Sequence, residues 1–368
     1  MNLYFNLFKV KFTKLDEIIQ NTIGGLPRGS AVNVFINLED VIRKLANPKV
    51  DEYLRISGEN KHIELISEII NLASHYRLYF AKNKIHSNVY LYIQYPFKGI
   101  QKNSMFNKDY RKYYYHKFNN DISYFSLSEA LHNAIPLAKI VLEYIEGVYF
   151  IESGNIENSV VPKVIMEHTK PTDLHNREIN ANFIVSTGIY DYQYVNNNTY
   201  VIISKQDESE ILTKDNVIKY IKRTNNINSN HNITSQFIPF ILSIIGNKHR
   251  NIYNIKGYGI KKVFKLLDTA LNENLITENM NNINLLSSII KSGYRDIVMN
   301  NYYCTDIGFQ YKQLNTKDIN DITSQIVDRF DNISLKKIND EFFANTPLNL
   351  MEITAKVSDI KNKPKVIF

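Results

Sequence analysis

Two glycines that flank a single residue, Gly257-Tyr258-Gly259, stand directly before a segment of helical periodicity that carries Lys261 and Lys262. Backbone N–H groups at the start of a helix can bind a phosphate, and neighbouring lysines add positive charge. This spacing therefore predicts contact with the phosphates of a nucleic acid. The alternative is an ordinary loop, because a Gly-x-Gly pair before a helix also occurs where no phosphate binds.

A second segment, residues 98–117, interleaves cations with aromatic rings. Cations for phosphates and aromatic faces for bases are the usual means of holding a single strand of nucleic acid. The alternative is a solvated surface helix, since A/T-rich codon use alone produces stretches of lysine and tyrosine. The cations are Lys98, Lys102, Lys108, Arg111, Lys112 and Lys117, and the rings are Tyr110, Tyr113, Tyr114 and Tyr115.

Residue patterns for other kinds of chemistry are missing from the sequence. It contains no H-E-x-x-H motif, no P-loop and no recognisable Ser/His/Asp arrangement, and its 9 histidines lack metal-ligand spacing. Cys304 is the single cysteine, which excludes a disulfide within the chain and a cysteine-based zinc site. We expect Cys304 to be a small buried residue.

The elements that must position these residues alternate between strand and helix over the first two thirds of the chain. Short apolar, β-branched segments predict strands, and apolar residues at helical spacing predict helices. Such alternation indicates a mainly parallel sheet with helices on both faces. The predicted strands are 31–38, 88–95, 148–153, 182–188 and 199–204, and the predicted helices are 39–46, 62–83, 126–147 and 157–168.

Composition sets wide limits on function. The chain has 368 residues, a net charge of +7 and 44% hydrophobic residues, so it can bury a core and its charge permits a nucleic-acid partner. Codon bias can also produce an excess of lysine, so the net charge alone is weak evidence for nucleic-acid binding. The position of the charges in the structure is the better criterion. No window approaches eighteen uninterrupted apolar residues, and the N-terminus lacks a secretory cleavage site. We therefore expect no membrane partner and a reducing intracellular location.

Taken in order, segments between Ala31 and Leu275 resemble the 5′–3′ exonuclease and flap endonuclease family. The resemblance implies a PIN-like α/β core with a mainly parallel central sheet flanked by helices, a helical helix–hairpin–helix-type region and a C-terminal extension. In that family, acids at the strand ends bind two divalent metals that activate water. The chemistry needs carboxylates because Mg²⁺ prefers oxygen ligands and carries two charges per ion.

In this chain, most positions that match those acids carry other residue types. The amides, hydroxyls and aliphatic groups found there do not neutralise a metal, and Arg250 would repel one by about 4 kcal/mol at 4 Å near a surface. The resemblance therefore predicts no divalent metal, and it allows a monovalent cation at the Gly257–Gly259 hairpin. The substituted positions are Asn37, Gln94, Ile156, Asn158, Ser159, Ile189, Asn247 and Arg250, and the remaining acid is Asp191.

The resemblance also divides the chain into regions. Residues 1–215 match the nuclease-like core, with an arch-like segment at about 96–120. Residues 216–275 match the helical hairpin region, and residues 276–368 form a helical or mixed extension. The polar, Asn-rich segment 205–233 is interpreted as a surface connection.

Three functions remain open at this point. The first is a catalytically inactive flap-endonuclease-like protein that binds nucleic acid, with DNA expected, or serves in a bacteriophage nucleoprotein assembly. The second is a structural or interaction protein, such as a virion component, with other phage proteins as partners. The third is a residual metal-dependent nuclease rebuilt around Asp191 with Glu157. The A/T-rich composition favours a phage, so we expect the protein in the host cytoplasm or the virion.

Overall fold

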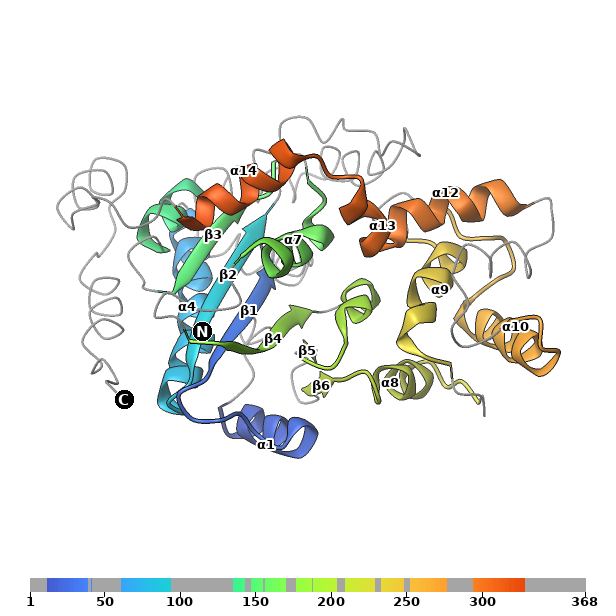
Figure 1. The fold of residues 1–368 in the computed structure, drawn as a ribbon, viewed down its shortest axis with the longest axis horizontal. Coiled ribbons are helices and arrows are strands. Elements are labelled where there is room, and N and C mark those ends of the chain that lie inside the picture. Colours follow the sequence, from blue (N-terminus) through green and yellow to red (C-terminus); the bar gives the residue numbers. More distant parts are fainter. Residues whose placement is uncertain are drawn as a thin grey trace.

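A six-stranded sheet forms the centre of the computed structural model (Figure 1), with the strand order β3-β2-β1-β4-β5-β6. The structure describes residues 12–38, 41, 61–93, 135–142, 147–154, 156–169, 177–186, 188–203, 209–228, 233–247, 252–276 and 294–327. The strands are β1 (Ala31–Asn37), β2 (His86–Ile93), β3 (Val148–Glu152), β4 (Ile179–Ser186), β5 (Thr199–Ile203) and β6 (Glu210–Leu212).

The sheet is parallel except at one edge, which confirms the predicted fold class. β1 pairs in parallel with β2 and β4, β2 with β3, and β4 with β5, whereas β6 is antiparallel to β5. The segment 205–233 is therefore more than a surface connection, because it contributes β6 and the helix α8 (Val217–Thr224). β6 escapes prediction because three residues are too few to show a period.

The order in which the chain adds strands to the sheet reverses between β1 and β4. From β1 it proceeds to β2 and β3 on one side, and it returns to β4, β5 and β6 on the other. In open parallel sheets, ligands bind beside the carboxyl ends of the strands at such a reversal point. In this chain the reversal point lies at the carboxyl ends of β1 and β4, and the residues there form the carboxyl edge of the sheet.

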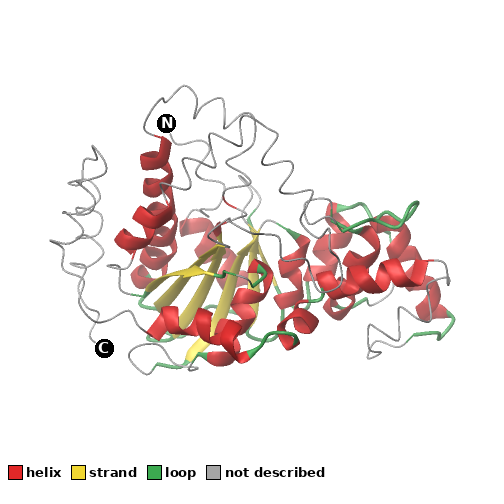
Figure 2. Ribbon diagram, turned by 90° about the horizontal axis from the view of Figure 1, so that it is seen from above, coloured by secondary structure: helices red, strands yellow, loops and turns green. Residues whose placement is uncertain are grey.

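Side chains from alternate strand positions enter two cores, one on each face of the sheet. Val32, Val34 and Ile36 belong to one core, and Phe35 belongs to the other. The first core is covered by α1 (Phe12–Ile23), α4 (Lys61–Lys82) and the helical residues 135–142. The second contains residues of α7 (Val161–His168) and of the helical region. Figure 2 shows helices on both sides of the strands, as the strand–helix alternation predicts.

Three asparagines on one face link the central strands inside the sheet layer. Asn33 of β1 donates from Nδ2 to Oδ1 of Asn182 on β4 at 2.9 Å, and Asn88 of β2 donates to Oδ1 of Asn33 at 3.2 Å. The three residues are neighbours in the strand register and are all buried. Each amide thus satisfies the next, which makes burial of these polar groups tolerable.

The chain beyond β6 is helical, and its last described part returns to the sheet. α12 packs against α9, while α14 packs against α7 and β3 (Figure 1). None of the helices that the structure describes has the length and apolar character that a membrane crossing requires. The elements are α8, η5 (Ser235–Phe237), α9 (Ile238–Ile245), α10 (Ile260–Asn272), α12 (Arg295–Thr305), α13 (Ile307–Lys312) and α14 (Thr316–Val327).

Candidate functional site

Polar side chains gather at the carboxyl edge of the sheet. Asn37 ends β1 and Ser186 ends β4, and the register of the two strands makes them neighbours. Asn158 lies in the short helix η3 (Asn158–Val160), which follows β3, and Asp191 lies in η4 (Ile189–Tyr194), which follows β4. All four residues are buried, because the short helices fold back over the strand ends.

Asp191 is bonded to the strand that precedes it. The hydroxyl of Ser186 donates to Oδ2 of Asp191 at 2.5 Å, and the backbone N–H of Gly188 donates to the same hydroxyl oxygen at 3.1 Å. Asp191 is only 4% exposed. One oxygen of this carboxylate is therefore used inside the protein to hold η4 against the end of β4.

The amide side chain of Asn158 and the backbone oxygen of Ser159, both in η3, also belong to internal contacts. Ser153 donates from Oγ to Oδ1 of Asn158 at 2.9 Å, and the hydroxyl of Tyr194 donates to the backbone oxygen of Ser159. These bonds connect the end of β3 to η3, and η3 to η4. Among the residues described, no group of three or more histidine, cysteine, aspartate and glutamate side chains is arranged to hold a metal ion.

Aromatic rings pack in the core on the face of the sheet that η4 also joins. Phe35, Tyr90 and Tyr149 stack across three strands, with ring centroids 5.1 and 4.9 Å apart. Tyr192 of η4 meets Tyr220 of α8 edge to face at 5.9 Å. Burial, and after it the neighbouring Tyr220, raises the pKa of Tyr192 well above its usual range. The core on this face of the sheet is therefore rich in aromatic rings, and η4 packs against α8 through one of them.

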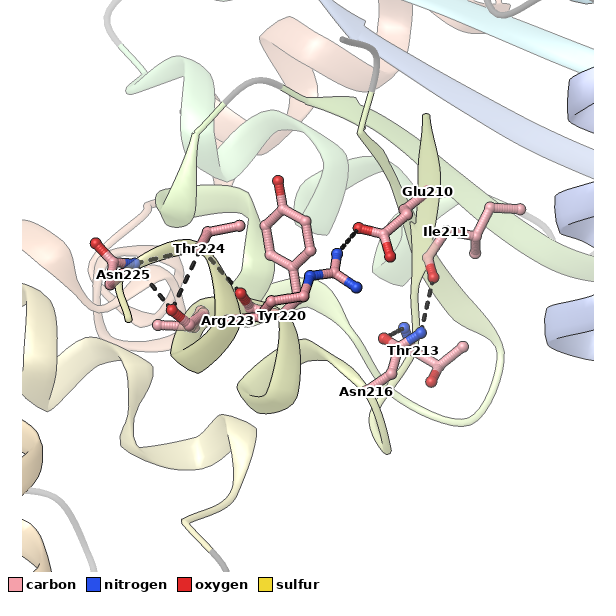
Figure 3. A network of polar contacts seen from close by, with 9 residues as sticks. Glu210, Ile211, Thr213, Asn216, Tyr220, Arg223, Thr224 and Asn225 are labelled. Atoms are coloured by element: carbon pink, nitrogen blue, oxygen red, sulfur yellow. Dashed lines mark hydrogen bonds and ion pairs between the residues drawn. The ribbon is translucent and has the colours of Figure 1, made fainter. Parts of the chain in front are cut away.

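The connection from the sheet to the helical region is a network of polar contacts (Figure 3). The side chain of Asn216 donates to the backbone oxygen of Ile211 at 2.9 Å and accepts from the N–H of Thr213 at 2.7 Å. Arg223 forms an ion pair with Glu210 and lies 5.5 Å from the ring centre of Tyr220. These contacts hold α8 against β6.

Residues of the C-terminal extension contact the same edge. Gln193 of η4 donates from Nε2 to the backbone oxygen of Thr305 at 2.9 Å, and its Oε1 accepts from the N–H of Ile307 at 3.3 Å. On α14, Gln325 donates to the backbone oxygen of Glu152 at 3.0 Å and accepts from its N–H at 2.9 Å. The extension is therefore bonded both to η4 and to the edge strand β3.

A tight hairpin connects α9 to α10. Gly246 has φ +67°, and a Cβ there would lie 2.5 Å from the backbone oxygen of Ile252, so the backbone crosses too closely for a side chain. The N–H of Asn247 donates to the oxygen of Ile252 at 2.8 Å, and the reverse bond measures 2.9 Å. Ile255 then donates to the oxygen of Ile244 at 2.9 Å. Asn247 thus serves the hairpin through its backbone.

The hairpin leaves the start of α10 open. Gly257 has φ +85° and turns the chain, and Gly259 precedes the first helical residue, Ile260. The first turn carries no acidic residue, and no side chain caps it. Lys261 and Lys262 are exposed. The two glycines and two lysines predicted as a phosphate site are therefore brought together at one helix terminus, although whether a phosphate binds there stays a prediction.

Several predicted positions lie outside the described residues, and the structure does not test them. They are Gln94 and Arg250 among the substituted acid positions, and the whole cationic segment Lys98, Lys102, Lys108, Arg111, Lys112 and Lys117. The two remaining positions, Ile156 and Ile189, are described: Ile156 is buried, and Ile189 is the first residue of η4.

The sequence analysis did not single out several residues whose side chains form hydrogen bonds in this region. Ser153 and Ser186 carried a usable signal, because each lies at or near the carboxyl end of a predicted strand, where polar groups collect. Gln193 and Asn301 carried none, since their bonds reach residues more than 45 positions away.

The sequence matches no protein-family model, and it matches no curated protein. Solved structures do match. A zinc-bound T5 5′-exonuclease superposes with a TM-score of 0.51 at 11% identity, covering 81% of this chain and 98% of that one. A flap endonuclease of bacteriophage T5, in complex with DNA and metal ions, gives a TM-score of 0.50 at 12% identity, with the same coverage. At such low identity the likeness concerns the fold, and the chain has the PIN-like α/β fold of the flap endonucleases and 5′-exonucleases.

Proposed function

We propose that the protein binds nucleic acid, with DNA as its expected partner, and does not cleave it. The observation that carries the binding is the start of α10, where a glycine turn leaves the helix terminus uncapped and Lys261 and Lys262 are exposed. Such a terminus attracts phosphate through its N–H groups and its dipole. The DNA in the complex of the structurally similar T5 flap endonuclease supports the same class of partner.

The proposal that the protein does not cleave nucleic acid rests on the residue types at the carboxyl edge of the sheet. Two divalent ions need several carboxylates. Among the residues that the structure describes at this edge, Asp191 is accompanied by the amides of Asn37 and Asn158, and the carboxylate of Glu152 is paired with Lys139. The carboxylate of Asp191 is also bonded to Ser186. The proposed function therefore uses no divalent metal. A monovalent cation at the Gly257–Gly259 hairpin is compatible with it, because such an ion adds positive charge beside a phosphate.

Binding and cleavage are tested together with flap, single-stranded and duplex DNA, in Mg²⁺ or Mn²⁺. We expect retarded complexes without cleavage products, and an affinity that falls as salt rises, as phosphate contacts require. The double variant Lys261→Ala/Lys262→Ala should weaken binding to every ligand. Its matched control is Lys312→Ala/Lys317→Ala, which removes the same charge from exposed positions on the C-terminal helices.

The other two functions predict different results in the same assay. A structural role, for instance in a virion, predicts no binding near physiological salt, and this result would overturn the proposal. A residual nuclease predicts metal-dependent cleavage that Asp191→Ala abolishes. Equal losses in both double variants would show that binding follows net charge and not the α10 terminus.

A further inference from the structure

Tyr253 is an exposed aromatic residue in the segment between α9 and α10. Its side chain is 60% exposed, the highest value among the large hydrophobic residues that the structure describes as exposed. Ile252 and Ile255, on either side, are buried. The ring of Tyr253 is therefore exposed to solvent, together with Asn254, between two isoleucines that are buried in the core.

The backbone of Tyr253 is held by a residue from a distant helix. Asn301 of α12 donates from Nδ2 to the backbone oxygen of Tyr253 at 2.7 Å and to that of Ser243 in α9 at 2.8 Å. Asn301 is itself buried. One buried amide thus joins three segments, and its removal would leave two carbonyl groups without this partner.

The close crossing at Gly246 adds a second restraint. A Cβ at that position would lie 2.7 Å from the carbonyl carbon of Tyr253 and 2.6 Å from the nitrogen of Asn254, so the two backbone segments touch directly. A side chain whose backbone is fixed in this way loses little entropy when it binds a partner. The hairpin is therefore a pre-organised support for one exposed ring.

The sequence around Tyr253 is basic. No aspartate or glutamate occurs from residue 246 to residue 267, and Lys256, Lys261 and Lys262 are exposed. Tyr258, the other tyrosine of this hairpin, already has the Nζ of Lys262 4.5 Å from its ring centre. For Tyr253 the structure records no such ring contact among the described residues. A ring with an accessible face, next to lysines, matches a base that is attached to a phosphate backbone.

We infer that Tyr253 stacks on an exposed nucleobase of DNA whose phosphates lie at the start of α10. This inference rests on the proposed function and specifies its substrate. In continuous duplex the faces of the bases are covered by their neighbours, so a ring beside the phosphates has no base face to contact. Tyr253 therefore gives a preference for DNA in which a duplex ends or adjoins an unpaired base.

The test compares three fluorescently labelled ligands by anisotropy: continuous duplex, the same duplex with a single-stranded overhang, and the overhang built from abasic nucleotides. Tyr253→Ala should weaken binding to the normal overhang by roughly 5- to 150-fold, the range for loss of one stacked base. Its affinity for continuous duplex and for the abasic ligand should stay that of the unmodified protein. Tyr253→Trp should retain the preference and quench 2-aminopurine in the overhang.

Tyr294→Ala is the matched control, because Tyr294 is another exposed tyrosine and directly precedes α12. It should bind all three ligands normally. An equal loss of affinity by Tyr253→Ala on all three ligands would overturn the inference and indicate a backbone contact. If Tyr253→Ala kept its affinity for the normal overhang while Lys261→Ala/Lys262→Ala bound DNA more weakly, the inference would be overturned and the proposed function would stand. If the unmodified protein bound none of the ligands, the proposed function would fail first, and the inference with it.

Discussion

The hydroxyl of Ser186, the last residue of β4, donates to the carboxylate of Asp191 at 2.5 Å, which ties η4 to the strand it follows. A carboxylate that serves as a metal ligand must face a site that an ion can enter. Asp191 instead is a buried residue of η4, next to the buried tyrosines Tyr190 and Tyr192 of the same short helix. This geometry favours a structural role for Asp191, which can be measured as an effect on the stability of the protein.

Substitution of Asp191 should affect stability. Asp191→Ala leaves the buried hydroxyl of Ser186 with only the backbone oxygen of Gly188, at 3.2 Å, as acceptor, and we predict a loss of about 1–3 kcal/mol in the free energy of unfolding. Asp191→Asn keeps an acceptor oxygen of the same shape and should lose less. Urea denaturation followed by circular dichroism measures both, with Asp215→Ala, an exposed acid, as control. Unchanged stability combined with loss of a metal-dependent cleavage would instead identify Asp191 as a ligand.

The asparagine ladder predicts a strongly non-additive set of substitutions. Asn33→Ala removes both ladder bonds and leaves Asn88 and Asn182 buried without them, so we expect a loss of roughly 2–5 kcal/mol. Replacement of all three asparagines by leucine should cost less than the single substitution, because no polar group is left unpaired. Denaturant midpoints decide between these outcomes. A triple variant less stable than Asn33→Ala would show that the ladder itself stabilises the fold, whereas the exposed Asn272→Ala should be neutral.

The fold could be predicted where the sequence pattern is local. β1, β2, β4 and β5 are rich in apolar residues, apart from the asparagines of the ladder and polar residues near the strand ends, because both faces of the sheet are buried, and this pattern indicates a parallel sheet. The helix α1 was missed although Leu15, Ile18 and Ile19 have helical spacing and are buried. Its apolar positions alternate with the charged residues Lys14, Asp16 and Glu17, which shortens the apolar pattern.

The contacts of the candidate site could be predicted only in part. Spacing indicated that Gly259 precedes a helix with Lys261 and Lys262 in its first turn, which the structure confirms. The bond from Asn301 to Tyr253 joins residues 48 positions apart, and no local pattern encodes it. The same holds for η4, a short helix whose shape depends on α9 and on the strand ends against which it packs.

Buried phenols predict a loss of stability at alkaline pH. Burial raises the pKa of Tyr76, Tyr79 and Tyr192 in the folded protein. The folded state therefore holds these protons more tightly than the unfolded chain, whose tyrosines titrate at about 10. The resulting stabilisation is complete below pH of about 10 and is lost as pH rises beyond it. Unfolding free energies measured across this range should fall, with phenolate absorbance appearing at unfolding. Tyr76→Phe should flatten the fall, whereas the exposed Tyr294→Phe should not.

Gly246 should tolerate no side chain, because two effects act together there. Its φ of +67° disfavours other residues, and a Cβ would meet the backbone of Ile252 at 2.5 Å. We predict that Gly246→Ala costs about 1–3 kcal/mol, from strain and from loosening of the hairpin. The substitution should also weaken binding to every DNA ligand, since the hairpin leads directly into the start of α10.

Gly188→Ala is the matched control for this prediction. Gly188 has φ −138°, and nothing lies within 4 Å of a Cβ built there, so alanine fits both the backbone and the space. Thermal unfolding and anisotropy, measured on both variants, separate the local effect from the general cost of replacing a glycine. If Gly246→Ala kept full stability and full affinity, the backbone crossing beneath Tyr253 would not be the restraint that holds the hairpin, and Asn301 would have to supply it alone.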